Sequence, residues 1–281
     1  MLSKLISSYS LLEVPENLSV FLVIVENDLY PLSRPLVQKL AKESPLPISY
    51  HWEPKMGIPC ARNRCLSAAN EESATHIAFV DDDEWFASDW LVNIWKRLKR
   101  YNEPTAIQGK VISTLPPQSK AYLQPFFQPK PKIDAQELNV CATNNAILDL
   151  AFVRKTGLKF DESRPYAGGT DAKFFRTANS KGLKIYYCED AVIYEDVPIT
   201  RASISWLTKR HFRHGLILSE NRVFPDPLSH FIFVVKKSFS IPRKVLKSIF
   251  FYAMNNKTKH VKTWLKACQN FGEVMGSFNY K

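Results

Sequence analysis

The sequence lacks the features that mark a secreted or membrane-spanning protein. Its five cysteines, at positions 60, 65, 141, 188 and 268, are odd in number and form no Cys-x-x-Cys pair, so neither a disulfide framework nor a zinc ribbon is indicated. The opening stretch MLSKLISSYSLLEVPENL has no continuous apolar core followed by a small-residue cleavage site, as a signal peptide would. No charge-free apolar run approaches the roughly 18 residues that cross a bilayer. We therefore expect a cytoplasmic protein that, if it meets a membrane, lies on its surface.

The composition allows a globular protein with a net positive surface. The 281 residues are 45% hydrophobic, which is enough for one large or two small domains with a buried core. Lys and Arg number 38 against 27 Asp and Glu, giving a net charge of +11. Such a charge favours nucleic acids, phosphorylated substrates or anionic lipid surfaces, and does not choose among them.

Strand and helix patterns alternate over the first 80 residues. The run LSVFLVIVEND from Leu18 is almost wholly apolar, which is typical of a strand buried on both faces. PISYHWEP and THIAFV predict two more strands. Helices are predicted over SRPLVQKLAKES, with Ser33 as N-cap, and over IPCARNRCLSAANEES. The alternation predicts a mainly parallel α/β sheet, in which ligands bind beyond the carboxyl ends of the strands.

The rest of the chain divides by composition. A proline-dense stretch, residues 113–132, predicts a long functional loop or a boundary. We expect one domain over residues 1–200, with a nucleotide-binding half at 1–115 and an acceptor half at 116–200. Residues 201–281 are expected to form a basic, aromatic-rich helical tail.

One segment of this tail, SIPRKVLKSIFFYAM, has an amphipathic pattern with Ser240 as a possible N-cap. At helical spacing a single arc carries its apolar side chains, namely Val245, Leu246, Ile249, Phe250 and Ala253. Basic residues occupy the other side. The pattern suits an interfacial membrane helix, and it equally suits a helix that packs on the protein's own core.

Four consecutive carboxylates, Asp81 to Glu84, follow the third predicted strand. Like charges this close repel unless a cation or a hydrogen-bond network offsets them. Mg²⁺ and Mn²⁺ take carboxylate oxygens and keep positions open for substrate phosphates, so a metal bridging a diphosphate fits here. Strand alternation would put Asp81 and Asp83 on one side and Asp82 on the other. The alternative is a solvated turn before the next helix.

Two other small motifs carry weaker signals. Gly168 and Gly169 would let backbone approach a ligand closely, or would simply form a turn. Asn144 and Asn145 offer amide donors and acceptors suited to a hydroxyl-rich ligand, and on spacing alone they fit a turn as well.

Four of these segments together resemble one family. FVDDDE, the upstream EPKMGIPCARNRCLSAA, and the downstream TNNAIL and GGTDAKFF occur in the order and at the separations found in family 2 glycosyltransferases. The similarity runs from about Leu18 to about Arg213, and it is strongest to bacterial members that build surface polysaccharides such as lipopolysaccharide. It implies a GT-A fold, a Rossmann-like α/β architecture.

The resemblance also implies roles for particular residues. Asp81 and Asp83 match the DxD-type motif, in which the first carboxylate approaches the nucleotide's ribose and both belong to the site of a Mn²⁺ or Mg²⁺ ion on the diphosphate. Asp171 matches the general base that takes the proton of the acceptor hydroxyl.

Other positions match the donor pocket. Glu26, Asn27 and Asp28 match the segment that receives the nucleotide's base and ribose. Arg62 and Asn63 match positions that line the donor pocket. Further contacts with sugar and acceptor fall on Asn144, Asn145, Gly168 and Gly169. Arg210 and Arg213 lie where relatives carry basic residues that neutralise the leaving diphosphate. The competing interpretation is that these two residues form a basic face toward lipid headgroups.

The implied reaction is metal-dependent, inverting transfer of a hexosyl-type sugar from a nucleotide-diphosphate donor, UDP-linked, to a lipid-linked or polysaccharide acceptor. The implied location is peripheral, at the inner face of the cell membrane, with an anionic membrane surface as partner and no nucleic acid. Inverting transfer needs a carboxylate near the acceptor and a cation near the departing phosphate.

The sequence departs from the family pattern at two places. Relatives carry Glu just before the base, and here that position is Thr170. Relatives also begin with an apolar strand that touches the nucleotide, whereas MLSKLISSYSLLEVPENL has the pattern of the helix after that strand. We expect that the true start lies upstream or that the product is truncated and weakly active or inactive.

Two other functions remain open at this point. A metal-dependent nuclease or nucleotidyltransferase would also use clustered carboxylates and a positive surface. A truncated chain could instead serve as a binding partner of an intact transferase.

Overall fold

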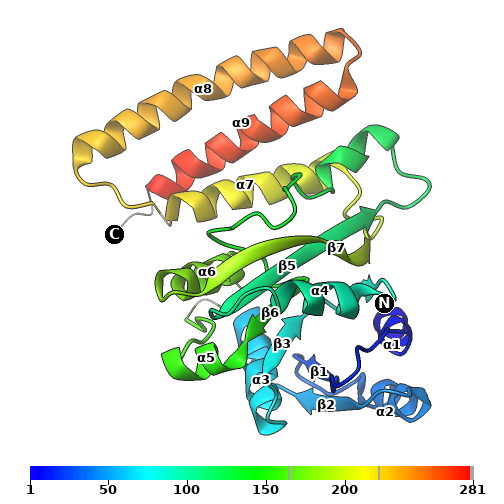
Figure 1. Cartoon of the computed structure of the whole chain (residues 1–281). Helices are drawn as coiled ribbons and strands as arrows, with labels where there is room; N and C mark the ends of the chain where they lie inside the picture. The colour runs from blue at the N-terminus through cyan, green and yellow to red at the C-terminus, as the bar shows by residue number, and fades with distance from the viewer. Residues whose placement is uncertain (164, 167, 221, 279–281) are drawn as a thin grey trace. The chain divides into compact units, whose positions relative to one another are not determined.

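The structure is a computed structural model, and it describes residues 1–163, 165–166, 168–220 and 222–278 (Figure 1). The chain divides into two compact units. The first combines Met1–Ile112 with Pro129–Glu195, and the second combines Ser113–Gln128 with Asp196–Lys281.

The division differs from the one expected at residue 200. It falls after Glu195, and the proline-dense segment contributes residues 113–128 to the second unit. The physical reason is burial: Leu123 and Phe127 pack in one hydrophobic cluster with Leu207 and Val261 of the C-terminal helices.

The first part of unit 1 follows the predicted alternation. Strand β1 (Leu22–Glu26) leads through helix α2 (Arg34–Glu43) to β2 (Ile48–Trp52), and helix α3 (Ile58–Glu71) leads to β3 (His76–Phe79). All five predicted elements are confirmed. β1 and β2 pair in parallel and form a two-stranded sheet by themselves.

The second sheet of unit 1 has five strands in the order β3-β6-β5-β7-β4. Its further strands are β4 (Glu84–Phe86), β5 (Thr105–Thr114), β6 (Ala146–Asp149) and β7 (Lys184–Asp196). β6 pairs antiparallel with both β3 and β5, and β4 pairs antiparallel with β7. The α/β class is confirmed, but the sheet is mixed rather than mainly parallel, because β6 and β7 return from the second half of the chain and insert beside β3 and β4.

The N-terminal segment forms helix α1 (Leu2–Tyr9), as its pattern predicts. Leu5, Ile6 and Tyr9 are buried. The Tyr9 hydroxyl donates to the carbonyl of Pro47 at 3.0 Å, which ties the end of α1 to the start of β2. The helix is therefore an integral part of the packed first unit.

Three more helices complete unit 1: α4 (Trp90–Leu98), α5 (Leu150–Thr156) and α6 (Thr170–Ser180). Two hydrophobic cores hold the unit together. One core joins β3 and β6 to α5 and α6, and the other joins α1 and α4 to β1 and β4.

Unit 2 is helical. It contains the 3₁₀ turn η1 (Ala121–Phe126) and helices α7 (Ile204–Glu220), α8 (Pro227–Ala253) and α9 (Lys257–Ser277). α9 packs against both α7 and α8 (Figure 1). Within the described ranges, none of the helices combines the length and the apolar character needed to cross a membrane.

The helix predicted within the tail is longer than expected. Ser240 lies in the middle of α8, so its assignment as an N-cap is wrong, and Asp226 caps the helix instead by accepting the Ser229 N–H at 2.8 Å. Ser240 accepts a hydrogen bond from Asn270 of α9 at 3.1 Å. Its hydroxyl therefore joins two helices.

Candidate active site

The acidic run forms a turn between β3 and β4. β3 ends at Phe79 and β4 begins at Glu84, and the Glu84 N–H donates to the Asp81 carbonyl at 3.2 Å. The strand alternation that predicted Asp81 and Asp83 on one side therefore does not apply, because the strand has ended before them. Asp81 and Asp82 are exposed, and Asp83 is half-buried.

The last carboxylate of the run, Glu84, is different from the others. Its side chain is only 2% exposed, and it accepts hydrogen bonds from the Asp81 N–H at 2.8 Å and from Asn144 Nδ2 at 3.0 Å. Burial, reinforced by the charge of Asp81, raises the pKa of Glu84 to about 8. The Glu84 side chain therefore stabilises the turn through these hydrogen bonds, and its carboxyl group keeps its proton near neutral pH.

Sequence reasoning did not assign Glu84 to the site. A signal was present in the alternation of β4, because Glu84 and Phe86 share one face of the strand and both are buried. A carboxylate on the buried face of a strand needs hydrogen-bond partners, and the Asp81 N–H and Asn144 supply them.

Electrostatics join the turn to helix α6. Although Asp81 as a residue is exposed, the protein around its carboxyl group removes part of the group's hydration and raises its pKa. The charges of Asp83, Asp82 and Asp171 raise this pKa further, whereas Arg62 lowers it. Arg62 also donates from Nη1 to Thr170 Oγ1 at 3.2 Å. The structure thus brings together three predicted residues, Arg62, Asp81 and Asp171, from α3, the β3–β4 turn and α6.

Asp171 occupies the first turn of α6, where its Oδ1 accepts the Ala172 N–H at 2.8 Å. Gly169 caps the helix with a φ of 82°, a left-handed conformation that glycine adopts without steric cost. Its carbonyl accepts the Lys173 N–H at 3.0 Å. Gly169 therefore sets the start of the helix that carries Asp171, and Gly168 before it is exposed.

Polar residues at the end of β1 and directly after it hold loops in place. Glu26 accepts the Ser33 N–H at 3.0 and 3.1 Å and also the Tyr50 hydroxyl, and these hydrogen bonds outweigh its burial and lower the pKa of Glu26. Ser33 is the N-cap of α2 as predicted, but its side chain makes no capping bond. Asp28 is exposed and accepts the Leu29 N–H at 2.7 Å.

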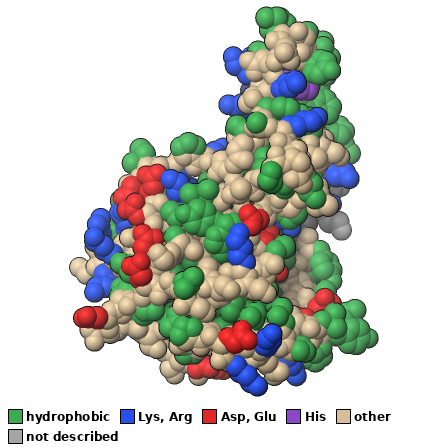
Figure 2. Space-filling view, turned by 90° about the vertical axis from the view of Figure 1, so that its right-hand side faces the viewer, with side chains coloured by type: hydrophobic (Ala, Val, Ile, Leu, Met, Phe, Trp, Pro, Cys, Tyr) green, Lys and Arg blue, Asp and Glu red, His purple; other side chains and the backbone are tan. Residues whose placement is uncertain are grey.

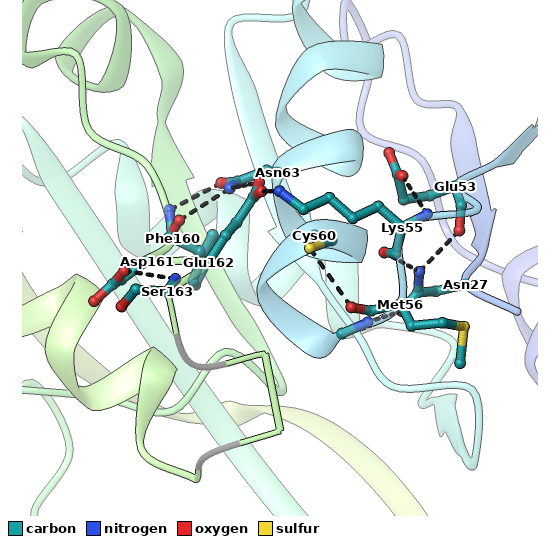
Figure 3. Close-up of polar contacts among 11 residues, drawn as sticks. Asn27, Glu53, Lys55, Met56, Cys60, Asn63, Phe160, Asp161, Glu162 and Ser163 are labelled. Atoms are coloured by element: carbon teal, nitrogen blue, oxygen red, sulfur yellow. Dashed lines mark hydrogen bonds and ion pairs between the residues drawn. The ribbon is translucent and has the colours of Figure 1, made fainter.

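Asn27 fixes the loop that leads into α3 (Figure 3). Its Nδ2 donates to the carbonyls of Glu53 and Lys55, both at 2.8 Å, and its Oδ1 accepts the Gly57 N–H at 2.8 Å. Gly57 has a φ of 136°, which other residues adopt only under strain. The end of β1 and the start of α3 are therefore connected directly.

A second set of contacts connects α3 to the loop before α6 (Figure 3). Asn63 Nδ2 donates to the Phe160 carbonyl at 2.9 Å and to Glu162 Oε1 at 2.7 Å, while its Oδ1 accepts the Phe160 N–H at 2.8 Å. Lys55 forms an ion pair with Glu162, and together with Asn63 it lowers the pKa of that carboxyl group. Sequence reasoning missed Lys55 and Glu162, since nothing local relates residues this far apart.

Asn145 belongs to the scaffold. It is fully buried with a φ of 55°, its Oδ1 accepts Trp90 Nε1–H at 2.7 Å, and its Nδ2 donates to the carbonyls of Lys110 and Ala191 at 2.9 Å each. Both of its amide hydrogens are thus used inside the fold. Its neighbour Asn144 reaches the site indirectly, through Glu84.

Arg210 and Arg213 lie on α7 of the second unit, and both are exposed. The guanidinium of Arg210 lies 5.1 Å from the centre of the Trp206 ring, a cation–π contact. Their predicted contact with a diphosphate stays a prediction.

The donor set of the turn suits a hard divalent cation that is shared with a substrate. In the described part of the chain, no three His, Cys, Asp or Glu side chains gather closely enough to hold a metal by themselves. Mg²⁺ in phosphate-transfer sites is bound by one or two carboxylates together with substrate phosphates. Asp81 and Asp83 fit that partial set, since the protein would supply only part of the coordination.

The mixed sheet, the acidic turn after β3 and the carboxylate of α6 define the GT-A class of glycosyltransferase fold. Solved structures of that class support the fold. The mannosyltransferase PcManGT from Pyrobaculum calidifontis, in complex with GDP-Man and Mn²⁺, matches all of this chain and 84% of its own with a TM-score of 0.64 at 16% identity. S. aureus TarS 1–349 in complex with UDP matches 99% of this chain and 87% of its own with a TM-score of 0.54 at 14% identity.

The chain belongs to glycosyl transferase family 2, because the model of that family matches residues 9–155. It is 32% identical over 225 residues to the succinoglycan biosynthesis protein ExoM of Rhizobium meliloti (strain 1021), a match that covers 78% of this chain and 72% of ExoM. Family membership makes the chain a glycosyltransferase, and it decides against the nuclease alternative.

Proposed function

We propose that this family 2 glycosyltransferase transfers a hexosyl group from a UDP-linked donor to a lipid-linked or polysaccharide acceptor during synthesis of a cell-surface glycan, with inversion and with the help of a divalent cation. The observation that carries the proposal is that Arg62 connects the two carboxylates: its Nη1 donates to Thr170, next to Asp171, and its charge favours the ionised form of Asp81. A site for inverting transfer needs this pairing of a phosphate-side carboxylate with an acceptor-side carboxylate.

The similarity to ExoM supports a polysaccharide product, since that relative is a succinoglycan biosynthesis protein. The solved relatives support the donor class, because TarS is in complex with UDP and PcManGT with GDP-Man and Mn²⁺. Asp83 and Asp81 would hold Mn²⁺ or Mg²⁺, and the ion would neutralise charge on the departing diphosphate.

In the proposed reaction the acceptor oxygen forms a bond to the anomeric carbon as the bond from that carbon to the diphosphate oxygen breaks. Asp171 takes the acceptor proton, and the nucleoside diphosphate leaves with the electron pair. A base in this role contributes roughly 10²- to 10⁴-fold to the rate. The nucleotide's base and ribose bind at the end of β1, next to Glu26, Asn27 and Asp28.

The proposed roles of Asn63 and Asn145 are limited by their hydrogen bonds. Both side chains bond to backbone groups of the protein, so we propose that they position the donor pocket and do not touch the sugar. Gly168, which is exposed, remains a proposed contact with substrate, and Asn144 acts on the site through its hydrogen bond to Glu84.

Calorimetry with UDP in the presence of Mn²⁺ and then of EDTA tests the proposal. We expect UDP binding in the micromolar range, roughly 1–1000 µM, only when Mn²⁺ is present. Asp83→Ala should abolish the effect of Mn²⁺ on UDP binding and should abolish turnover. The matched control Asp82→Ala, one residue away in the same turn, should keep both the Mn²⁺ effect and turnover. Equal affinity in EDTA, or equal damage from the two substitutions, would contradict the metal site. Absence of UDP binding would favour the alternative of an inactive binding partner.

We also propose that α8 places the enzyme on an anionic membrane surface. Three large apolar side chains of its predicted arc are exposed, since Leu246 is 68% exposed, Ile249 57% and Phe250 59%, whereas Val245 is half-buried. The exposed basic residues Arg243 and Lys247 lie on the same helix. Hydrophobic and basic side chains share the surface around the α8–α9 turn at the top of Figure 2. Apolar burial and attraction to anionic lipids act together in such a helix.

Flotation with vesicles tests this location. Vesicles rich in phosphatidylglycerol should carry the protein up the gradient, and pure phosphatidylcholine vesicles should carry much less. Leu246→Asp should release it, whereas the control Ile133→Asp, at an apolar residue of unit 1 that is 78% exposed, should not. Equal binding by both variants would remove α8 from the membrane contact.

A further inference from the structure

Helix α8 carries an apolar stripe along almost its whole length. At about 100° per residue, an arc of roughly 100° holds at least one apolar residue in every turn. The most exposed members of this arc define the apolar stripe: Leu228, Phe231, Phe239, Leu246, Ile249 and Phe250. Phe239 is 76% exposed, and the other five are between 57% and 68% exposed. A surface helix normally turns such a face toward the core of its protein, so the outward direction of this stripe is unusual.

α8 packs against α9 (Figure 1), and polar side chains make the contacts between the two helices. Lys237 of α8 forms an ion pair with Glu273 of α9 at 2.6 Å, and Glu273 is only 3% exposed. Ser240 accepts a hydrogen bond from Asn270 Nδ2 at 3.1 Å, and Asn270 is buried as well. A carboxylate and an amide of α9 are therefore buried against the polar side of α8.

A third polar contact lies nearer the turn between the helices. Ser248 of α8 is 1% exposed, and its hydroxyl donates to the His260 carbonyl at 3.1 Å. We call these three contacts the polar seam. Its α8 members, Lys237, Ser240 and Ser248, lie about 130–170° around the helix from the middle of the apolar stripe. α8 is thus polar toward its neighbouring helix and apolar toward the outside.

The polar seam fixes the rotation of α8 about its own axis. Well-packed apolar side chains in place of a buried ion pair are often as stable or more stable, because burial removes the charges from water. Buried polar groups between helices instead select one register, since only that register satisfies them. A half-turn of α8 would bring the apolar stripe onto α9 and would take the α8 partners away from Glu273 and Asn270.

The charge of α8 identifies the partner that suits the stripe. The helix contains five Lys and Arg residues and neither Asp nor Glu. Lys236, Arg243 and Lys247 are exposed, and at helical spacing they lie along one flank of the stripe. A second copy of α8 would bring like charges together, whereas anionic lipid headgroups attract them. Apolar and basic side chains in this arrangement fit an anionic lipid surface.

We propose that the polar seam is a positioning device for membrane contact. It holds the apolar stripe outward over about 33 Å, so that α8 lies flat at the boundary between the anionic headgroups and the acyl chains. The flanking Lys236, Arg243 and Lys247 contact headgroup phosphates, and α9 lies on the side of α8 away from the lipid. This inference rests on the membrane contact proposed above, and it adds the buried residues that direct that contact.

Thiol labelling of the full chain in the absence of vesicles measures the rotation of α8. Leu246→Cys reports on the apolar stripe, and Ser248→Cys reports on the polar seam two residues further along the same helix. Peptide mass spectrometry assigns the maleimide label to its residue, so the native cysteines do not interfere. We expect Leu246→Cys to react at least about tenfold faster than Ser248→Cys.

Replacement of the buried ion pair tests the seam itself. Lys237→Met combined with Glu273→Met leaves the net charge unchanged and removes both charged partners together. The ratio of the two labelling rates should fall below about threefold, because α8 can then also pack through its stripe. Flotation with phosphatidylglycerol vesicles should fall by about threefold or more. The matched control, Lys237→Glu with Glu273→Lys, reverses the ion pair and should keep the labelling ratio and the flotation.

A second variant and the melting temperature cover the case of misfolding. Asn270→Leu removes the hydrogen bond to Ser240 and keeps the ion pair, so it should lower the labelling ratio by a smaller factor. The double Met variant should melt no lower than the parent, since its apolar side chains replace a buried ion pair.

Three results would overturn the inference. A parent-like labelling ratio in both the double Met variant and Asn270→Leu would show that the seam does not set the rotation, even if the vesicles still bind. Parent-like flotation of a variant with a lowered ratio would separate the rotation from the membrane contact. Slower labelling of Leu246→Cys at higher protein concentration, without vesicles, would make a second copy the partner. Failure of the proposed membrane contact looks different, because the parent would then not float although its labelling ratio stays high, and lipid would be excluded as the partner.

Discussion

Arg62 donates a hydrogen bond from Nη1 to Oγ1 of Thr170 at 3.2 Å. Thr170 directly precedes the proposed base, Asp171. Through this hydrogen bond Thr170 holds the Arg62 guanidinium beside the first turn of α6. From there the positive charge of Arg62 also acts on Asp81.

Replacement of Arg62 should change the pH dependence of metal binding. Arg62 favours the ionised form of Asp81, so Arg62→Met should raise the pKa of Asp81 further. Mn²⁺ needs the ionised carboxylate, and its affinity should therefore start to fall at a higher pH than in the parent protein. Titration of Mn²⁺ affinity against pH measures this. The control is Arg64→Met, on the same helix, where Arg64 pairs with Glu71 instead. Identical pH profiles for the parent and Arg62→Met would contradict the coupling.

Removal of the proposed base should separate catalysis from binding. Asp171→Asn keeps the size of the side chain and its hydrogen bond from Ala172, but the amide cannot accept a proton from the acceptor. Turnover should fall by about 10²-fold or more, with UDP affinity unchanged. Initial rates of UDP release and calorimetry measure the two quantities. Asp190→Asn, at an exposed carboxylate of the same unit, serves as the control. Near-normal turnover of Asp171→Asn would assign the base elsewhere.

The buried Glu84 should make the metal-free protein lose stability as the pH rises. An acid whose pKa is higher in the folded state binds its proton more tightly there, so its contribution is complete below the unfolded pKa near 4.5 and is lost as the pH rises toward 8. Glu84→Gln cannot ionise and should lack this loss, on the order of 3 kcal/mol. Urea unfolding in EDTA between pH 5 and pH 8 gives the free energies. Equal pH slopes for the two proteins would show that Glu84 titrates normally.

Asn145 should matter for stability rather than for donor binding. Asn145→Ala removes the hydrogen bonds that Trp90 Nε1 and the Lys110 and Ala191 carbonyls make with the buried amide, at a cost of roughly 2–4 kcal/mol. Asn144→Ala removes a single hydrogen bond to Glu84 and should cost about 1 kcal/mol. Thermal and urea unfolding compare the two variants. A larger loss of stability for Asn144→Ala would contradict the scaffold role of Asn145.

The residues by themselves determined the local elements and the family. The apolar run of β1, the capping position of Ser33 and the α3 pattern are properties of short stretches, and they were predicted correctly because burial pattern and capping act over a few residues. The four motifs likewise indicated a family 2 glycosyltransferase.

Tertiary structure alone decided which polar residues face each other. Glu84 is buried, Asn145 is committed to Trp90, and Lys55 meets Glu162 only because packing brings distant loops together. The mixed sheet has the same origin, since the pairing of β3 with β6 joins segments far apart in the chain. Local sequence carries no record of such partners, because a hydrogen bond or ion pair depends on distance in space and not on separation along the chain.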